Sequence, residues 1–330
     1  MKVPRLLLCP LVCAALSPGL ARAAAPPEDV QLRAEAVRML ERASLVSTSP
    51  RLPNLERTDA FLALDPAYGT REGSFTRVMI QGTGRRDETT FGDYHAVNVY
   101  FSGRLYRART QAVAPPEVAN LMRLAPIELV RFNQEDVIRA ITARETEGHA
   151  LRCIEFDTIA GEKTDNNEIC VDSASGALMT LKNGNEFIEN GDFFAFAGQL
   201  VPAKIRYSVG GVLKLEVTQT MTELTDATPD VLEAPPNAQV LSGCTTFRRA
   251  FGQSVPQPKP GAGGAISNVL VRGVIGINGR VQDAVVQSTE RPDLNPEALT
   301  TIQQWQFTPA LCNGNPVPVD ASIVLHFQGR

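Results

Sequence analysis

The hydrophobic pattern of residues 269–328 constrains the fold most. Two runs of alternating apolar and polar residues, each typical of a half-buried strand, flank Asn278-Gly279, a dipeptide that strongly favours a two-residue hairpin turn. A helical pattern follows, and a last alternating run places Ile323, Leu325 and Phe327 on one side. This order predicts a ββαβ unit with a single hydrophobic face.

The helix of this unit has marked ends. We expect Asn295 to cap its N-terminus, because a short polar side chain can accept a hydrogen bond from a free backbone N–H. Pro296 suits the first helical position, where no N–H is needed. The chain leaves the helix at Trp305, followed by Phe307 and Pro309. We expect Trp305 and Phe307 to pack the helix on the sheet, and the alternative is that they form an interface.

These residues resemble the C-terminal domain of TonB-family proteins. The matching segments are Gly279-Arg280-Val281-Gln282-Asp283, Leu294-Asn295-Pro296-Glu297-Ala298-Leu299, Trp305-Gln306-Phe307-Thr308-Pro309, Asn313-Gly314 and Pro316-Val317. The resemblance covers about a fifth of the chain. It implies a module whose sheet edge binds an extended peptide of an envelope protein, or a second copy of the chain, by strand addition.

The first residues have the form of a secretory signal peptide. Lys2 and Arg5 precede an apolar run over residues 6–16, and Ala21-Arg22-Ala23 offers a small-residue cleavage site. The run is shorter than the roughly 20 residues that span a bilayer. We therefore predict residues 1–23 to be a signal peptide cleaved after Ala23, with no transmembrane anchor and a mature protein in the periplasm.

The net charge of the chain limits the classes of macromolecule that it can bind. Removing residues 1–23 would take away three basic residues (Lys2, Arg5 and Arg22) and no acidic one, so the net charge would fall from −4 to −7. An acidic chain without a basic stripe is a poor partner for nucleic acid.

Four cysteines remain after the predicted cleavage site, and an even number behind a signal peptide favours disulfides. Cys153 and Cys170 lie in two alternating runs separated by a turn-like segment, so their sulfurs would face each other across a hairpin. Cys244 would then pair with Cys312. The alternative is four buried free thiols. A metal site has no CxxC or histidine spacing to support it.

Residues 24–225 read as mostly strands. An amphipathic helix is expected over residues 28–44, with Val30, Ala34, Val37 and Leu40 on its buried side. A second helical stretch covers residues 116–132. The predicted strands are 75–82, 96–101, 137–144, 149–158, 168–172, 177–182, 203–209 and 213–224. The pattern indicates a curved antiparallel sheet wrapped around helices.

This part resembles the LolA/LolB-like superfamily of periplasmic lipoprotein carriers. The segments that carry the resemblance are Gly191-Asp192-Phe193-Phe194 and Gly198-Gln199-Leu200-Val201-Pro202-Ala203-Lys204-Ile205, followed by paired alternating strands. The resemblance implies a half-barrel with helices on its concave face. It also implies a possible cavity for a lipid or acyl chain.

The expected class is therefore α+β, with residues 24–225 as the half-barrel and residues 265–330 as the TonB C-terminal-like domain. Residues 226–264 contain six prolines and five glycines and are predicted to be a semi-extended linker.

No catalytic constellation is evident. His95, His149 and His326 have no nucleophile or ligand partner at a recognisable spacing, and Gly82-Thr83-Gly84 suits a strand-end turn better than a dinucleotide loop. We expect no cofactor or metal and a non-enzymatic binding or adaptor protein. The alternative is a lipid or lipoprotein carrier, and a hydrolytic enzyme is a third, weaker hypothesis.

Overall fold

The structure is a computed structural model of the 330-residue chain. It describes residues 30–47, 52–65, 69–124, 132–133, 136–146, 148–160, 163–259, 267–289 and 291–327. The predicted signal peptide and its cleavage site after Ala23 lie outside these residues. Among the helices that are described, none combines the length and the apolar character needed to cross a membrane.

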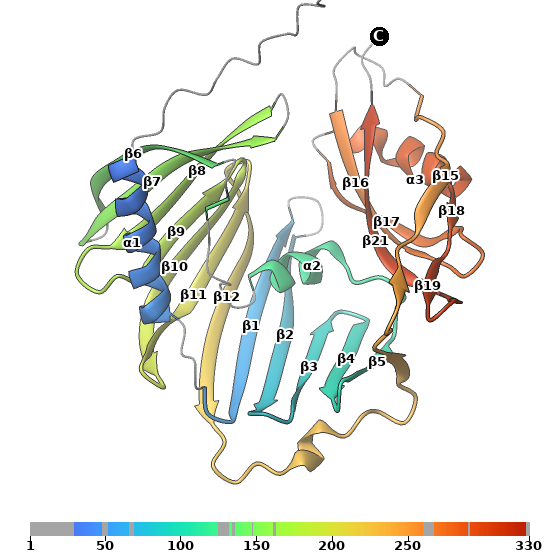
Figure 1. Cartoon of the computed structure of the whole chain (residues 1–330), viewed down its shortest axis with the longest axis horizontal. Coiled ribbons are helices and arrows are strands. Elements are labelled where there is room, and N and C mark those ends of the chain that lie inside the picture. The colour runs from blue at the N-terminus through green and yellow to red at the C-terminus, as the bar shows by residue number, and fades with distance from the viewer. Residues whose placement is uncertain are drawn as a thin grey trace, which may run out of the picture.

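A single antiparallel sheet of 13 strands forms most of the molecule (Figure 1). Its strands are β1 (Leu55–Asp65), β2 (Gly69–Ile80), β3 (Gly84–Phe91), β4 (Tyr94–Phe101), β5 (Arg104–Arg109), β6 (Asp136–Thr146), β7 (His149–Ala160), β8 (Lys163–Asp172), β9 (Leu178–Asn183), β10 (Glu186–Phe196), β11 (Gln199–Val209), β12 (Val212–Glu223) and β13 (Gln239–Ser242). The spatial order is β13-β5-β4-β3-β2-β1-β12-β11-β10-β9-β8-β7-β6. The predicted α+β class with a large antiparallel sheet is confirmed.

One face of the sheet, which we call the inner face, carries an apolar row that crosses seven strands. The row consists of residues that are direct partners on neighbouring strands: Ile154, Ile169, Leu181, Ile188, Tyr207, Leu215 and Ala63. Two helices, α1 (Val30–Ser47) and α2 (Pro116–Arg123), lie against this face (Figure 1). Both helices therefore cover the same side of the sheet.

The buried stripe of α1 differs from the predicted one. Val30 is 79% exposed and Val37 is 37% exposed, while the residues that pack on β6–β9 are Ala36, Met39, Leu40 and Ala43. Of the predicted stripe, only Leu40 is buried. Ala36 and Ala43 are small, so the helix backbone can lie close to the sheet. This close contact, rather than the burial of the largest side chains, determines which side of α1 faces the sheet.

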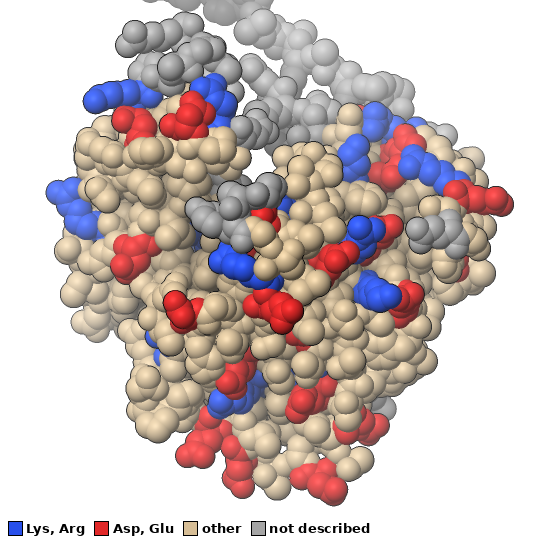
Figure 2. Space-filling view, turned by 180° about the vertical axis from the view of Figure 1, so that it is seen from behind, with Lys and Arg blue, Asp and Glu red and all other residues tan. Residues whose placement is uncertain are grey.

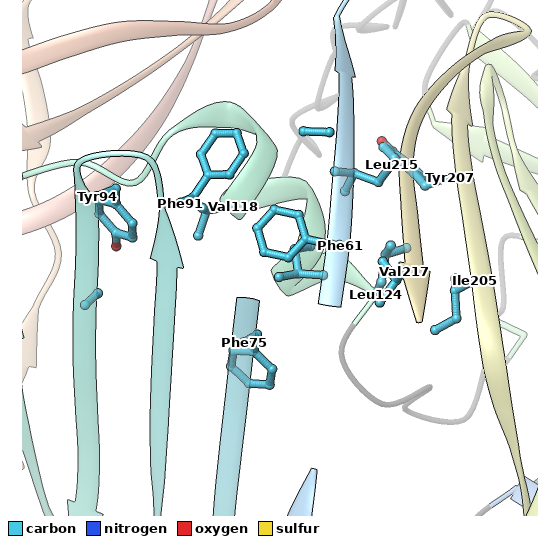
Figure 3. Packing of buried hydrophobic residues seen from close by; sticks show 13 residues of the cluster. Phe61, Phe75, Phe91, Tyr94, Val118, Leu124, Ile205, Tyr207, Leu215 and Val217 are labelled. Carbon is cyan, nitrogen blue, oxygen red and sulfur yellow. The ribbon is translucent and has the colours of Figure 1, made fainter. Parts of the chain in front are cut away.

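The second helix fills the middle of the inner face. Val118 and Leu121 of α2, and Leu124 directly after it, pack on aromatic side chains of β1 to β3 (Figure 3). Phe61 stacks on Phe91 with ring centroids 5.5 Å apart. The helix ends at Arg123, which is shorter than the stretch predicted to reach residue 132. Residues 125–131 of that prediction lie outside the described part of the chain.

The C-terminal domain has its own core. Its elements are β16 (Ser267–Ile275), β17 (Val281–Thr289), η2 (Pro292–Leu294), α3 (Asn295–Gln304), β18 (Gln306–Thr308), β19 (Ala310–Cys312), β20 (Asn315–Val317) and β21 (Val319–Phe327). The order β17-β16-β21 forms a sheet on which α3 packs, with Ala298 and Ile302 of the helix fully buried. Three short strands, β18 to β20, lie between the helix and the last strand.

The predicted N-cap is wrong. Asn295 already has helical backbone angles, φ −57° and ψ −44°, and no side chain caps this helix. The reason is that the 3₁₀ turn starting at Pro292 runs directly into α3. A capping residue needs a non-helical backbone, so Asn295 cannot serve as one. Pro296 is the second residue of α3 and not the first, as was predicted, but it still lies in the first turn.

The aromatic residues after the helix pack inside the C-terminal domain. Trp305 and Phe307 join its hydrophobic core with ring centroids 6.0 Å apart. The Trp305 indole N–H donates to the Pro256 carbonyl oxygen at 2.9 Å. Pro309 follows β18 and leads to the fully buried Ala310.

The segment predicted as a linker is structured over much of its described length. It contains η1 (Pro229–Leu232), β13, β14 (Phe247–Arg248) and β15 (Phe251–Ser254). Leu232 is buried against β3 and β4 on the outer face, and β13 pairs with the edge strand β5. Beyond β13, β14 pairs with β19 and β15 with β18. The segment thus belongs partly to each domain.

Both predicted disulfides are present. Cys153 and Cys170 are direct partners on β7 and β8 and are bonded to each other. Cys244 is bonded to Cys312, which fixes the chain just after β13 to β19. The first bond joins neighbouring strands within the large sheet, and the second attaches the connecting segment to the C-terminal domain.

Two glycines of the C-terminal domain provide a matched pair for testing its core. Gly279 and Gly314 have φ of +74° and +84°, but a Cβ on Gly279 would overlap the Phe307 carbonyl, whereas nothing lies within 4 Å of one on Gly314. We expect Gly314→Ala to cost about 1–2 kcal/mol through backbone strain alone. Gly279→Ala should cost clearly more. Urea unfolding followed by fluorescence of Trp305, the single tryptophan, measures both, and equal losses would contradict the clash.

Candidate functional site

A row of polar side chains crosses the inner face next to the apolar region covered by α2. Its members are direct partners on β1 to β5: Arg57, Arg77, Asp87, Asn98 and Arg107. Arg57 is six residues from Ala63 on the same strand, and this even spacing places both side chains on the inner face. We call this set the inner polar row.

The charges of the row that lie on β1 to β3 are paired. Arg57 binds Asp59 with a shortest distance of 2.6 Å, and their side chains are 4% and 0% exposed. Arg77 binds Asp87 through two hydrogen bonds of 2.7 and 3.0 Å. The Phe75 ring lies 5.7 Å from the Arg57 guanidinium and 5.4 Å from that of Arg77. Charges this deeply buried persist in a fold only when they are paired in this way.

The row ends in contact with the C-terminal domain. Arg107 donates from Nε to the Asn98 side-chain oxygen at 3.0 Å and from Nη1 to Asp320 Oδ2 at 2.9 Å. Arg109, two residues further along β5, donates from Nη2 to Asp320 Oδ1 at 3.2 Å. Asp320 belongs to β21, so two arginines of the large sheet hold one carboxylate of the small one.

A small cavity lies at this contact. Its volume is about 100 Å³, and it is lined by Tyr94, Ala96, Asn98, Arg107, Arg109, Val113 and Ala114 of the large domain and by Arg272, Gly273 and Asp320 of the C-terminal domain. We call it the interdomain cavity. Its ionisable lining consists of three arginines, one aspartate and one tyrosine, which gives a net charge of +2 when the tyrosine is neutral.

Tyr94 remains a hydrogen-bond donor in this setting. Burial raises the pKa of its hydroxyl, and the nearby arginines oppose that rise only in part. The neutral hydroxyl is therefore the stable form at physiological pH. Among the described residues, no hydrogen bond engages this hydroxyl, and no hydrogen bond or ion pair engages the Arg272 side chain.

A larger cavity lies at the end of β2 and β3. Its volume is about 530 Å³, and most of this space is open to solvent. Its lining residues are Leu52, Met79, Ile80, Gln81, Gly82, Thr83, Gly84, Arg85 and Tyr100. The predicted turn at Gly82 is present here, with φ +70°. The inner face thus has open space at this end, while the helices fill its middle.

The sheet of the C-terminal domain has two edge strands. β17 pairs with β16 through two register shifts, whereas β21 pairs with β16 without a shift over nine residues. In the described part of the chain, no strand pairs with the outer edge of β21. Its outward-facing side chains include Ser322, Val324 and His326.

The three histidines are far apart in the fold and each contacts a local polar partner. His95 lies 2.9 Å from Glu88, His149 lies 3.3 Å from Asp172, and His326 lies 2.7 Å from Asn268. The His95 contact lowers the pKa of the Glu88 carboxyl, and the Ser175 backbone N–H does so for Asp172, with a smaller contribution from His149. None of these contacts contains a nucleophile with a base.

The described residues contain one group with metal-ligand spacing, formed by Cys153, Glu168 and Cys170. The two sulfurs are joined in a disulfide and cannot act as thiolate ligands. Seen from behind, the outer face shows acidic and basic side chains interspersed (Figure 2). The functional candidates on this chain are therefore the inner face, the interdomain cavity and the edge of β21.

Comparison with known families concerns the C-terminal domain. Residues 264–328 match the family model described as the Gram-negative bacterial TonB protein C-terminal. The match covers about a fifth of the chain and confirms the resemblance stated for these residues. A search of curated proteins finds no match.

Solved structures are similar to the larger part. A LolA superfamily protein from Nitrosomonas europaea is 11% identical, with a TM-score of 0.38, and the match covers 60% of this chain and 97% of that one. A DUF1329 family protein from Desulfovibrio piger is 10% identical with a TM-score of 0.41, covering 61% and 96%. The MucA/MucB complex from Pseudomonas aeruginosa is 11% identical with a TM-score of 0.26, covering 75% and 82%. The superfamily named for the large sheet is thus among the matches.

The ion pairs of Asp320 with Arg107 and Arg109 lead to a prediction about what holds the two domains together. Asp320→Lys would place a fourth positive charge among three arginines, so we expect the C-terminal domain to move away and the radius of gyration from small-angle scattering to rise. Asp320 is 37% exposed, so the native pairs contribute only about 1 kcal/mol or less each. Wild-type protein in 1 M salt, where the Debye length is about 3 Å, should change in the same direction. His326→Lys, on the same strand, is the control, and scattering unchanged by Asp320→Lys would refute this role.

Proposed function

We propose that this protein is a non-enzymatic binding or adaptor protein of the periplasm that takes up an extended segment of an envelope protein. The segment would add as a further strand along the outer edge of β21. Main-chain hydrogen bonds would supply the affinity, and side chains of alternate residues would supply the specificity. The two disulfides favour an oxidising compartment outside the cytoplasm.

The regularity of β21 is the observation that carries this proposal. Its nine-residue ladder with β16 has no bulge, so the backbone groups on its other side form an even row. β17 is the poorer edge, because its two register shifts and the positive φ of Asp283 break the row, and α2 packs beside it. Exposed regular edges attract pairing unless they are blocked.

The large domain would act as a scaffold in this function. Its inner face is filled over most strands by α1 and α2, and charged pairs complete the row next to α2. The part of the inner face under α1 and α2 cannot take a further large ligand without displacing a helix. The connecting segment, held on both sides, and the ion pairs of Asp320 would together keep the edge of β21 in position.

A photo-crosslinking residue at Val324 tests strand addition. Val324 is 44% exposed on β21, and Val212, 45% exposed on β12, is the matched control. In the intact periplasm we expect a defined adduct from position 324 and not from 212. A synthetic peptide of the crosslinked segment should then protect the amides of residues 319–327 from hydrogen exchange. Equal adducts from both positions, or a peptide that leaves these amides unprotected, would refute the proposal.

The second candidate function is a lipid or lipoprotein carrier, and the 530 Å³ cavity favours it. Leu52 and Met79 give the cavity an apolar part that would hold an acyl chain. Native mass spectrometry of protein recovered without detergent should then show added mass that extracts into organic solvent. Met79→Trp should remove this mass by filling the cavity. A bare mass for the wild-type protein would exclude a stably loaded carrier.

A further inference from the structure

The interdomain cavity is built from groups that recognise an anion. Three guanidinium groups line it, and arginine stays charged at any physiological pH. Asp320 balances one of the three charges. The side chains of Arg107 and Arg109 are only 24% and 22% exposed, so water screens their charge less than at an open surface.

Several donors in the cavity have no acceptor among the described residues. The Arg272 side chain and the Tyr94 hydroxyl are in this state, and both line the cavity from opposite domains. Arg109 contacts only the Asp320 carboxylate. A donor that no protein group engages can bind a ligand oxygen without first breaking a hydrogen bond within the protein.

The size of the cavity limits what it can hold. A volume of about 100 Å³ is well below the roughly 300–1,000 Å³ of pockets that enclose a whole drug-sized molecule. One planar or tetrahedral oxyanion group fits this space, and the rest of the ligand would lie outside.

We propose that the interdomain cavity is an oxyanion site in which Arg272, Arg109 and Tyr94 bind one carboxylate or phosphate group of a ligand. The guanidinium fork matches the oxygen geometry of both groups and can bind them with two parallel hydrogen bonds. Asp320 keeps Arg107 and Arg109 in place, and Arg272 brings the free charge from the second domain. The bound group would therefore contact both domains at once. This site does not depend on strand addition at β21 or on a lipid in the larger cavity.

An NMR titration of the ¹⁵N-labelled full chain tests the site. Sodium phosphate and sodium acetate are added separately at constant ionic strength, with sodium chloride as the balancing salt. The reporters are the side-chain Nε–Hε resonances of Arg109 and Arg272. We expect saturable shifts from at least one of the two anions. The stronger of them shows which of the two oxyanion geometries the cavity prefers.

Variants separate a built site from general charge effects. Arg272→Gln should weaken binding by about tenfold or more, since a hydrogen bond to a charged group is lost. Tyr94→Phe keeps the ring and removes one donor, so a several-fold loss is expected. Arg206→Gln is the control, because Arg206 is 53% exposed on β11 in a surface ion-pair network. Absence of saturable shifts, or equal affinity in Arg272→Gln and wild type, would overturn the proposal.

Discussion

The pairing of β13 with β5 is the contact on which the arrangement of the two domains depends. Without β13, β5 would leave an unpaired edge on the large sheet. The same short strand ends at Ser242, and Cys244, two residues later, is bonded to β19 of the C-terminal domain. The strand that β13 covers also carries Arg107 and Arg109. One ladder therefore sets both the path of the chain and the place where the second domain meets the first.

The inner face of the large sheet is divided between two kinds of interaction. Under the helices, side chains such as Phe61 and Leu121 are almost completely buried and stabilise the fold by about 1.5–3 kcal/mol each. Beside them, the inner polar row buries charges whose pairing mainly offsets their own desolvation. Such a row adds little net stability, but it leaves the face polar towards β5. At β5 the C-terminal domain contacts the large sheet through the ion pairs of Arg107 and Arg109 with Asp320.

The parts of the fold that follow simple periodicity could be predicted from the sequence. The hairpin between β16 and β17, the facing cysteines and the alternating strands β11 and β12 belong to this class. The two-residue turn predicted at Asn278-Gly279 was wrong, because the Gly279 N–H donates to the Gly276 carbonyl oxygen in a longer loop. β1, β3, β5 and β10 were missed because their inward positions include charged or polar residues, such as Arg57, Asp87 and Arg107, where the pattern requires apolar ones. β13 was hidden in a proline-rich segment, since only the free edge of β5 makes those four residues a strand. The prediction of Asn295 as the N-cap was wrong because a 3₁₀ turn runs directly into α3.

The candidate sites could not be read from the sequence because topology brings their residues together. Arg107 and Asp320 are 213 residues apart, and each looks like an ordinary charge on a strand surface. In the fold, Asp320 is the second residue of β21, so the interdomain cavity lies at the beginning of the edge proposed for strand addition. A segment added along β21 would place one of its ends close to Arg272 and Tyr94. An acidic group at that end of the segment would bind better than a neutral one. The free energies of strand addition at β21 and of anion binding in the interdomain cavity would then be coupled, because both contacts involve β21.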